Sequence, residues 1–273
     1  SPVYDAELMR RAFEYCRMFD KPILAHEEVL ELSHGGVMNE GIVSMSLGLE
    51  GMPAAAEEVM IGRDIALADV TGGRLHVMHV STAQGVNLIR EAKSRGVRVT
   101  AEACPHHFTL TDESLRGFDS NFKMSPPLRT AKDVEGILKG LADGTIDCIA
   151  TDHAPHAPEK KLLELDRAPF GILGLETAVG LSVTRLIESG HIDWPRFVEA
   201  ISLLPAKILG INRGTLRPGA IADVTLIDPS HEWQVDVNSF ASKSVNSPFH
   251  GWTLRGRAVA TIVHGKVKYR LST

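Results

Sequence analysis

The stretch IDCIATDH (146–153) has the composition of a buried strand that ends in two ionisable side chains, Asp152 and His153. Three other short runs share this design and end at or just before polar groups: PILAH (22–26), LHVMHV (75–80), and VRVTAEA (97–103), which precedes Cys104, His106 and His107. Strands that are apolar on both faces are typical of a parallel sheet covered by helices. In such folds the chemistry lies at the carboxyl ends of the strands.

Helical patterns alternate with these runs. The spacing of apolar residues predicts helices over 5–19, 53–70, 83–95, 131–142, 174–189 and 194–204. Pro53 suits the first turn of its helix, and the Asp143-Gly144 turn would end the helix before residue 146. Four alternations of strand and helix predict an α/β fold built as part of a (β/α) barrel.

The pattern changes after about residue 205. The segments 214–228 and 252–269 combine Gly and Pro turns with alternating apolar residues, and the second has a turn at His264-Gly265. Such segments predict a small antiparallel β segment. We therefore expect a partial barrel over residues 1–210 and a C-terminal β-sandwich segment over residues 211–273.

The composition excludes several classes of protein. The chain has 273 residues, 44% of them hydrophobic and 23% charged, which is ordinary for a globular protein. The formal net charge of -5 argues against nucleic-acid binding through bulk positive charge. No apolar run reaches the ~18 residues of a membrane span, and no signal-peptide pattern is present. The three cysteines form no CxxC pair, which favours a reducing, cytoplasmic location.

Three strand-end residues could form a metal site. His26, His79 and Asp152 are far apart in sequence, but parallel strands would bring them to one edge of the sheet. Imidazole and carboxylate groups are the usual ligands of hydrolytic zinc, and Asp152 could accept a proton from water and pass it to a leaving nitrogen. Each residue alone has a plainer explanation, as a hydrogen-bonded core histidine or a capping carboxylate. Ionisable groups at four consecutive strand ends favour the site.

Seven motifs have the order and spacing of one enzyme family. They are AHEE (25–28), GGVMNEG (35–41), HVSTA (79–83), PHHFTLTD (105–112), SPPLRT (125–130), DGTIDCIATDHAPHA (143–157) and PFGILGLET (169–177), and the likeness continues through RGTLRPGAIADVTLID (213–228) and the closing strands. Together they resemble the dihydroorotases, specifically the bacterial type I enzymes of the amidohydrolase superfamily. Allantoinases and dihydropyrimidinases share the barrel and TDHAPH, but resemble this chain less around PPLR and FGILGLET.

The resemblance implies a reaction and a metal. The reaction is the reversible conversion of N-carbamoyl-L-aspartate to L-dihydroorotate in pyrimidine biosynthesis, at the mouth of a (β/α)8 barrel. The resemblance also implies zinc, with two ions in a complete enzyme. In this chain it makes His26 and His79 metal ligands, and Asp152 the catalytic carboxylate that also contacts the metal.

The resemblance implies four substrate contacts as well. His156 would bind the substrate carboxylate, and the backbone at Phe170 and Gly171 would meet the pyrimidine ring. Ser125 stands where the family usually has Asn before PPLR. Serine is shorter and offers one hydroxyl in place of an amide, so this contact would differ from that of the family.

Some features of the family are missing from the sequence. The family's first barrel strand carries a His-x-His metal pair followed by a substrate-binding Arg, and this chain contains no His-x-His. The family's metal-bridging carboxylate lies just upstream of the point that matches Ser1. We therefore expect the chain to begin after the fourth strand and to supply the equivalents of strands 5–8. A half barrel would expose two sheet edges.

Three explanations remain open. The chain is a fragment of an active enzyme that associates with a missing N-terminal piece, or an inactive dihydroorotase-like scaffold subunit, as a partner of aspartate transcarbamoylase. The third is a binding module without catalysis, which an absence of bound zinc would favour. The retained His26, His79, Asp152 and His156 favour the active enzyme. We expect a small-molecule substrate, no nucleic-acid or membrane partner, and a homo-oligomer or an association with the missing piece.

Overall fold

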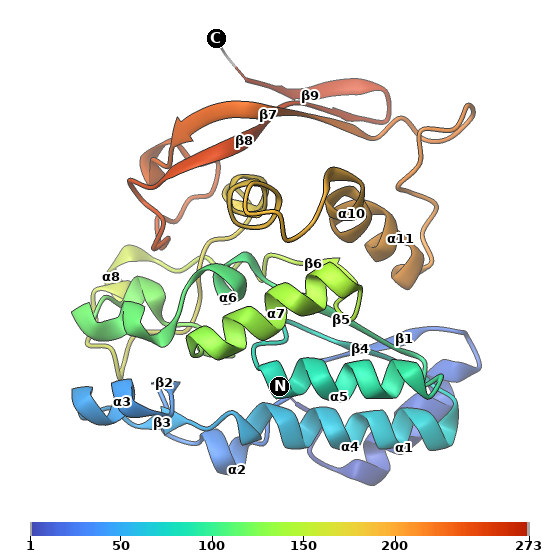
Figure 1. Cartoon of the computed structure of the whole chain (residues 1–273), viewed down its shortest axis with the longest axis vertical. Coiled ribbons are helices and arrows are strands. Elements are labelled where there is room, and N and C mark those ends of the chain that lie inside the picture. Colours follow the sequence, from blue (N-terminus) through green and yellow to red (C-terminus); the bar gives the residue numbers. More distant parts are fainter. Residues whose placement is uncertain (1, 272–273) are drawn as a thin grey trace.

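Figure 1 shows the computed structural model of the chain, which describes residues 2–271. The lower part contains a parallel sheet with long helices beside and below it, shorter helices lie in the middle, and an antiparallel sheet lies at the top. The α/β class predicted from the sequence is confirmed.

The lower sheet has four parallel strands. Their order is β1 (Pro22–Ala25), β4 (Arg74–Val77), β5 (Val99–Ala103) and β6 (Cys148–Ile149). Every neighbouring pair is parallel, so the four carboxyl ends point the same way. Each hydrogen-bonded strand is shorter than the apolar run that predicts it, and in β1, β4 and β6 the last residues of the run leave the ladder to enter the loops of the candidate site.

Four long helices pack against one face of this sheet. They are α1 (Ala6–Arg17), α4 (Ala55–Thr71), α5 (Ala83–Ser94) and α7 (Ala131–Asp143), within a few residues of the predicted ranges. Three of them have a side-chain N-cap, and Asp5 accepts a hydrogen bond from the Leu8 amide at 3.0 Å. Fully buried apolar side chains fill the interface: Phe13, Ile61, Leu75, Val77, Ile89 and Ile137.

The other face of the sheet is more polar than the sequence analysis predicted. His76 on β4 pairs with Thr100 Oγ1 at 2.8 Å and with Glu102 Oε2 at 3.0 Å, both on β5. These side chains alternate with the apolar ones that face the helices, as the period of two requires. The prediction of strands that are apolar on both faces was wrong for β4 and β5. In these strands polar residues alternate with apolar ones, and the apolar residues alone are enough to form the face that packs against the helices.

The middle layer is built from two interrupted helices. The first runs from α9 (Ala178–Ser182) into the π-helical turn η3 (Val183–Ile187). The second runs from α10 (Trp194–Val198) through the π-helical turn η4 (Glu199–Leu203) to α11 (Leu204–Leu209). It extends five residues beyond the predicted end, because Pro205 stands in the first turn of α11, where no N–H is needed.

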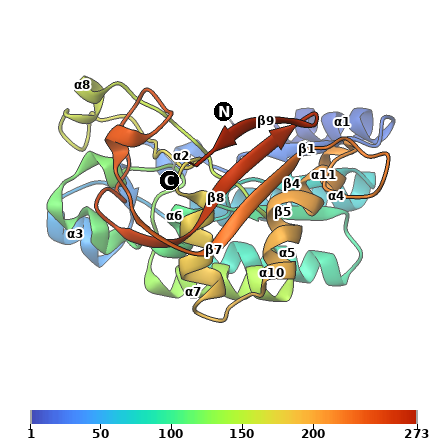
Figure 2. The ribbon, with the colours of Figure 1, turned by 90° about the horizontal axis from the view of Figure 1, so that it is seen from above.

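The upper sheet is antiparallel, in the order β7 (Val224–Gln234), β8 (Thr253–Val263) and β9 (Lys266–Arg270). Figure 2 shows it lying across the helices of the middle layer. The turn at His264-Gly265 is confirmed. The segment 214–228, predicted as turns followed by a strand, contributes the start of β7 at Val224, and a register shift between Asp228 and Glu232 carries β7 past Pro229 to Gln234.

Short elements surround the carboxyl ends of the parallel strands, and the sequence analysis predicted none of them. They are α2 (Leu30–Ser33), β2 (Met38–Asn39), α3 (Ile42–Leu47), β3 (Gly51–Met52), α6 (Pro105–Thr109), η1 (Asp112–Gly117), η2 (Ser120–Phe122), α8 (Pro158–Lys161) and η5 (Val237–Ser239). Several contribute to a second apolar cluster that includes Met38, Leu115 and Leu128.

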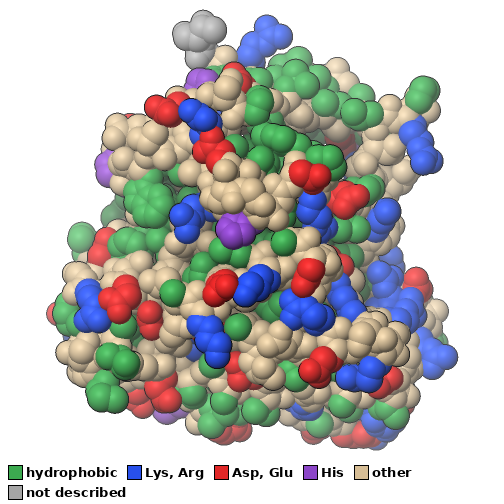
Figure 3. All heavy atoms as spheres, in the orientation of Figure 1, with side chains coloured by type: hydrophobic (Ala, Val, Ile, Leu, Met, Phe, Trp, Pro, Cys, Tyr) green, Lys and Arg blue, Asp and Glu red, His purple; other side chains and the backbone are tan. Residues whose placement is uncertain are grey.

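On the face shown in Figure 3, neither charged nor hydrophobic side chains form a single dominant patch. There, Lys and Arg side chains alternate with Asp and Glu over the helices of the lower layer. Within residues 2–271, no helix is long and apolar enough to cross a membrane.

Candidate active site

Two histidines meet at the carboxyl ends of neighbouring strands. His26 directly follows β1, and His79 lies two residues beyond β4. Their rings are arranged edge to face, and Nδ1 of His26 lies 3.0 Å from Nε2 of His79. The structure thus brings together two of the three residues that the sequence analysis assigned to the metal.

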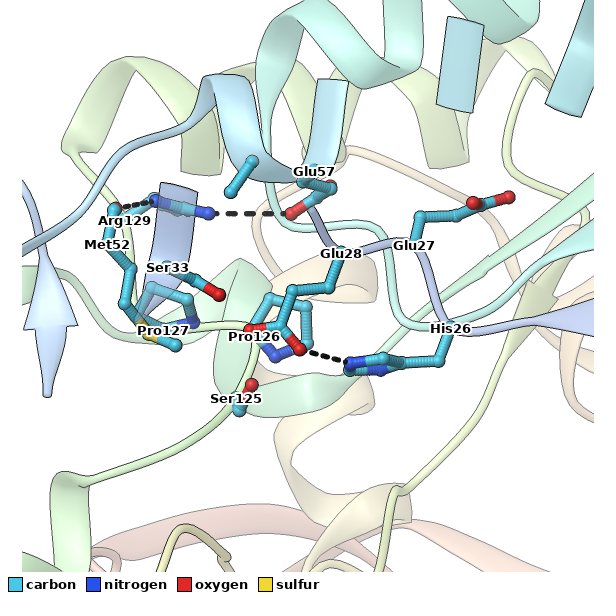
Figure 4. Close-up of a pocket in the computed structure, with 11 residues that line it drawn as sticks. His26, Glu27, Glu28, Ser33, Met52, Glu57, Ser125, Pro126, Pro127 and Arg129 are labelled. Atoms are coloured by element: carbon cyan, nitrogen blue, oxygen red, sulfur yellow. Dashed lines mark hydrogen bonds and ion pairs between the residues drawn. The ribbon is translucent and has the colours of Figure 1, made fainter. Parts of the chain in front are cut away.

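Hydrogen bonding fixes the orientation of His26. Its Nε2 lies 3.0 Å from Oε2 of Glu28, and because a carboxylate can only accept, Nε2 donates the proton (Figure 4). The Nδ1 of a neutral His26 therefore presents a lone pair toward His79. Burial, with a smaller contribution from His26, lowers the pKa of His79 to about 4, so its imidazole is neutral at pH 7.

This donor pair fits a bound metal ion. Two imidazoles on one tetrahedral zinc, with Zn–N distances of 2.0–2.1 Å, hold their nitrogens roughly 3.3 Å apart. The observed separation of 3.0 Å is close to that value. Glu28 supplies the carboxylate that commonly orients a metal-binding histidine through its other ring nitrogen.

Asp152 is the third residue that the sequence analysis assigned to the metal. It follows β6, and its side chain is half-buried. Burial raises the pKa of its carboxyl, and His26 opposes that shift. Between residues 2 and 271, one group of three or more metal-type donors has all its ligand atoms within 4.8 Å, and that group contains none of His26, His79 and Asp152.

His79 and Asp152 share an unusual backbone conformation. Their φ angles are 34° and 43°, and they are two of five non-glycine residues with positive φ in the described part of the chain. Residues other than glycine rarely adopt positive φ angles, and such strained backbone conformations cluster at functional sites. The strain supports the assignment of these two strand ends to one site.

A buried cluster forms the floor behind His79. It contains Cys104, His106 and His107, which are at most 2% exposed and begin α6. His107 donates from Nε2 to the carbonyl of Pro126 at 2.9 Å. Burial lowers the pKa of His107 to about 3 and raises that of the Cys104 thiol, so both groups are uncharged.

The predicted substrate contacts lie on two neighbouring loops. His156 Nε2 donates to the carbonyl of Phe170 at 2.7 Å, and the Gly171 amide donates to the carbonyl of Lys123 at 2.9 Å. Gly171 has a φ of 147°, and a Cβ at this position would lie 2.7 Å from Nε2 of His156. These residues therefore form one tightly packed unit.

Ser125 lies on the wall of a small pocket beside His26 (Figure 4). Glu28, Pro126 and Arg129 also line this pocket. Lys123, two residues before Ser125, holds the Gly171 amide, so the chain connects the pocket to the unit containing His156. The structure thus brings Ser125 close to His26, and it shows no hydrogen bond between Ser125 and His156.

Sequence reasoning missed the buried network around Arg129. Arg129 is 3% exposed and donates to Asn39 Oδ1 at 3.0 Å and to the carbonyl of Met52 at 2.7 Å. Glu57 lies 3.7 Å from its guanidinium and accepts the Ser81 amide at 2.8 Å. The motifs GGVMNEG, HVSTA and SPPLRT therefore meet at one cation. The presence of these three motifs could be recognised in the sequence, but their contacts with one another could not.

Comparison with known proteins agrees with this architecture. Residues 1–268 match the model of the Amidohydrolase family. The chain is 53% identical to a protein named dihydroorotase from Citrifermentans bemidjiense, over 98% of this chain and 63% of that protein. It is 58% identical to a dihydroorotase from Pelotomaculum thermopropionicum, over 97% of this chain and 62% of that protein.

Solved structures give the same fold at lower identity. L-hydantoinase (dihydropyrimidinase) from Arthrobacter aurescens matches with a TM-score of 0.88 and 28% identity, over 100% of this chain and 64% of that one. Dihydropyrimidinase from Brevibacillus agri matches with a TM-score of 0.87 and 25% identity, over 97% and 60%. The chain spans somewhat less than two thirds of these relatives. The match over residues 1–268 shows that this chain belongs to the amidohydrolase family.

Proposed function

We propose that this chain carries part of the active site of a dihydroorotase, which interconverts N-carbamoyl-L-aspartate and L-dihydroorotate. The observation that carries the proposal is the identity of 51–58% to proteins of that name along nearly the whole chain. The solved hydantoinases and dihydropyrimidinases are only 23–29% identical, which makes a dihydropyrimidinase-type activity the weaker candidate.

His26 and His79 would hold one zinc ion of a pair, with Asp152 in contact with the metal. Bound zinc would polarise the substrate carbonyl and activate a water molecule. Glu28 would keep the proton of His26 on Nε2, so that Nδ1 stays available as a ligand. The donor set supports zinc because the two imidazoles are adjacent and buried or half-buried, and because the lowered pKa of His79 keeps its imidazole neutral at pH 7.

Asp152 would move the proton of the reaction. Opening of the dihydroorotate ring breaks an amide C–N bond, and the leaving nitrogen must gain a proton. Asp152 would accept the proton of the attacking water and then deliver it to that nitrogen. Its burial, which raises the pKa of the carboxyl, favours the protonated form needed for the second step.

The two loops would hold the substrate. His156 donates from Nε2 to Phe170, so Nδ1 is the atom left for the substrate carboxylate. Donation from this atom to a carboxylate requires a proton on both ring nitrogens. The backbone at Phe170 and Gly171 would line the ring, and the Ser125 hydroxyl would make a further polar contact.

A substrate comparison tests this proposal. The metal-loaded protein, in the assembly in which it is isolated, is assayed with N-carbamoyl-L-aspartate, dihydroorotate, dihydrouracil, hydantoin and allantoin. We expect turnover of the first two only, its loss on chelation and its return with zinc. Faster hydrolysis of dihydrouracil or hydantoin would assign the chain to the other branch of the family. A folded, metal-loaded protein that is inactive on all five would favour the scaffold role.

Partners and location belong to the same proposal. A homo-oligomer, an association with a polypeptide that supplies further barrel strands, and a complex with aspartate transcarbamoylase each give a distinct mass in solution. Cys16, Cys104 and Cys148 are all free thiols, which supports a reducing compartment such as the cytoplasm.

A further inference from the structure

The connection between β7 and β8 reaches the loops that hold the proposed substrate contacts. We call residues 153–156 and 170–174 the site loops. They lie side by side, because the Ala154 amide donates to the carbonyl of Ile172 at 3.0 Å and residues 153 and 172 form a parallel bridge. Two residues of the β7–β8 connection contact these loops: the Asn246 side chain binds to both, and the Ser242 hydroxyl lies against His153 in the first.

Asn246 makes three side-chain hydrogen bonds to the site loops. Its Oδ1 accepts the His156 amide at 3.0 Å. Its Nδ2 donates to the carbonyls of Ala154 at 2.9 Å and Gly171 at 3.1 Å. Asn246 is 2% exposed, and its own carbonyl accepts the Leu173 amide at 3.0 Å. A carboxamide is required here, because the position needs two donors and one acceptor from one short side chain.

Ser242 provides a second, weaker link. Its amide donates to Oε1 of Glu176 at 2.9 Å, and its hydroxyl lies 3.2 Å from Nε2 of His153. His153 Nδ1 accepts the Gly174 amide at 3.2 Å, so Nε2 carries the proton and donates to the Ser242 hydroxyl. Removal of this hydroxyl leaves the backbone contact of Ser242 in place.

We propose that Asn246 is a positioning residue for substrate binding, which sets the distance between His156 and Gly171. This inference rests on the proposed function. The packing leaves little tolerance, since a single added carbon at Gly171 would lie 2.7 Å from the His156 ring. A change in the bonds of Asn246 therefore moves the atoms that face the substrate.

The position of Asn246 makes its effect separable from metal binding. The hydrogen-bond partners of Asn246 belong to the site loops, whereas His26 and His79 follow β1 and β4 and are oriented by each other and by Glu28. Loss of Asn246 should raise KM for dihydroorotate while the zinc content stays unchanged. A purely structural role would instead lower the thermal stability, kcat and metal content together.

The test is Asn246→Asp in the metal-loaded protein in its isolated assembly. This change replaces two donors by a carboxylate that faces the carbonyls of Ala154 and Gly171. We expect KM for dihydroorotate to rise about tenfold or more, with zinc content as in the wild type. Asn87→Asp is the matched control, since Asn87 is exposed on α5 and accepts from Arg90, which a carboxylate can also do. Ser242→Ala should raise KM less than Asn246→Asp.

The outcomes separate the two proposals. A wild-type protein without turnover of dihydroorotate contradicts the proposed function itself. An active wild type with an unchanged KM in folded Asn246→Asp overturns the positioning role. If that variant does not fold, Asn246→Ser takes its place under the same criteria, because serine introduces no charge and offers one hydroxyl for hydrogen bonding. A parallel fall in stability, kcat and zinc content without a rise in KM also overturns the inference.

Discussion

A single carboxylate accounts for the orientation of the first proposed ligand. Because Glu28 accepts from Nε2 of His26, the lone pair of Nδ1 is directed toward His79 at 3.0 Å. Imidazole nitrogens this close have one shared proton or one shared cation between them. His79 and Asp152 both have positive φ, a strained conformation that is common at functional sites.

Asp152→Asn should abolish turnover without loss of the fold. The amide cannot take a proton from water, and loss of general acid-base catalysis costs about 10²–10⁴ in rate. The measurement is kcat for dihydroorotate, with circular dichroism to check folding. The control is Asp69→Asn, an exposed carboxylate near the end of α4, which should keep wild-type activity. Retention of a tenth or more of kcat in Asp152→Asn would remove Asp152 from the mechanism.

Gly171→Ala should impair substrate binding, whereas Gly62→Ala should not. At Gly171 the new carbon meets Nε2 of His156 at 2.7 Å and the Ala154 Cβ at 2.8 Å, on a backbone with φ of 147°. At Gly62, within α4, nothing lies within 4 Å, so alanine should stabilise the helix by about 0.5–1 kcal/mol. KM and urea unfolding measure the two effects. Equal KM values in both variants would show that the His156 ring does not need its observed position.

At the scale of elements, periodicity identified the long helices and the strand positions, because each buries one continuous apolar face. It could not predict α2, α3, β2 or β3, which are too short to show a period. The continuation of β7 beyond Asp228 was missed for a different reason. A bulge after Asp228 is decided by pairing with β8, which lies about 25 residues further along the chain.

The residues of the candidate site likewise include some that the sequence could predict and some that it could not. His26, His79 and Asp152 could be predicted because each ends an apolar run of its own. Arg129 and Asn246 could not, because their roles depend on partners 48 to 92 residues away, such as Ser81 and Ala154. A sequence shows which residues are polar near a strand end, but only the fold shows which buried carbonyls they satisfy.

Lys123→Met should loosen the segment that carries Phe170. Lys123 is 2% exposed, donates to the carbonyls of Leu165 at 2.6 Å and Asp166 at 3.2 Å, and lies 4.5 Å above the Phe170 ring. Methionine would leave a buried carbonyl unsatisfied, so we expect a loss of about 1–3 kcal/mol in the free energy of unfolding, measured in urea.

The matched control is Lys139→Met. Lys139 is exposed on α7 and pairs with Glu135, so its removal should change the free energy of unfolding by less than about 1 kcal/mol. A second readout is Lys161, whose pKa burial lowers to about 8, with a contribution from the positive charge of Lys123. In Lys123→Met this pKa should rise, because a nearby like charge is gone. Equal stability of both variants, with no change in the Lys161 titration, would contradict the bracing role.

At the scale of the whole molecule, the parallel sheet keeps two free edges in the described residues. β1 pairs only with β4, and β6 pairs with β5. Leu24 on β1 is 48% exposed, and His76 and Glu102 line a pocket with α11 on the face away from the long helices. Open strand edges with exposed apolar side chains favour association with further chain. Asn246, in the connection between two strands of the antiparallel sheet, contacts the loops that hold the proposed substrate contacts, so the proposed site draws on both parts of the fold.

Residues 1–273 alone are therefore expected to be a poor catalyst. The family resemblance implies a His-x-His metal pair and a substrate-binding Arg that this sequence does not contain. Their absence removes metal ligands, and with them the activated water and a charge-assisted bond to the substrate carboxylate. The experiment is to refold these residues with zinc, assay conversion of dihydroorotate, and repeat the assay with the N-terminal segment of a dihydroorotase added in trans. We expect activity and a larger complex only in the second case. Activity of the chain alone near that of a full-length dihydroorotase would show that residues within 1–273 replace the missing ligands.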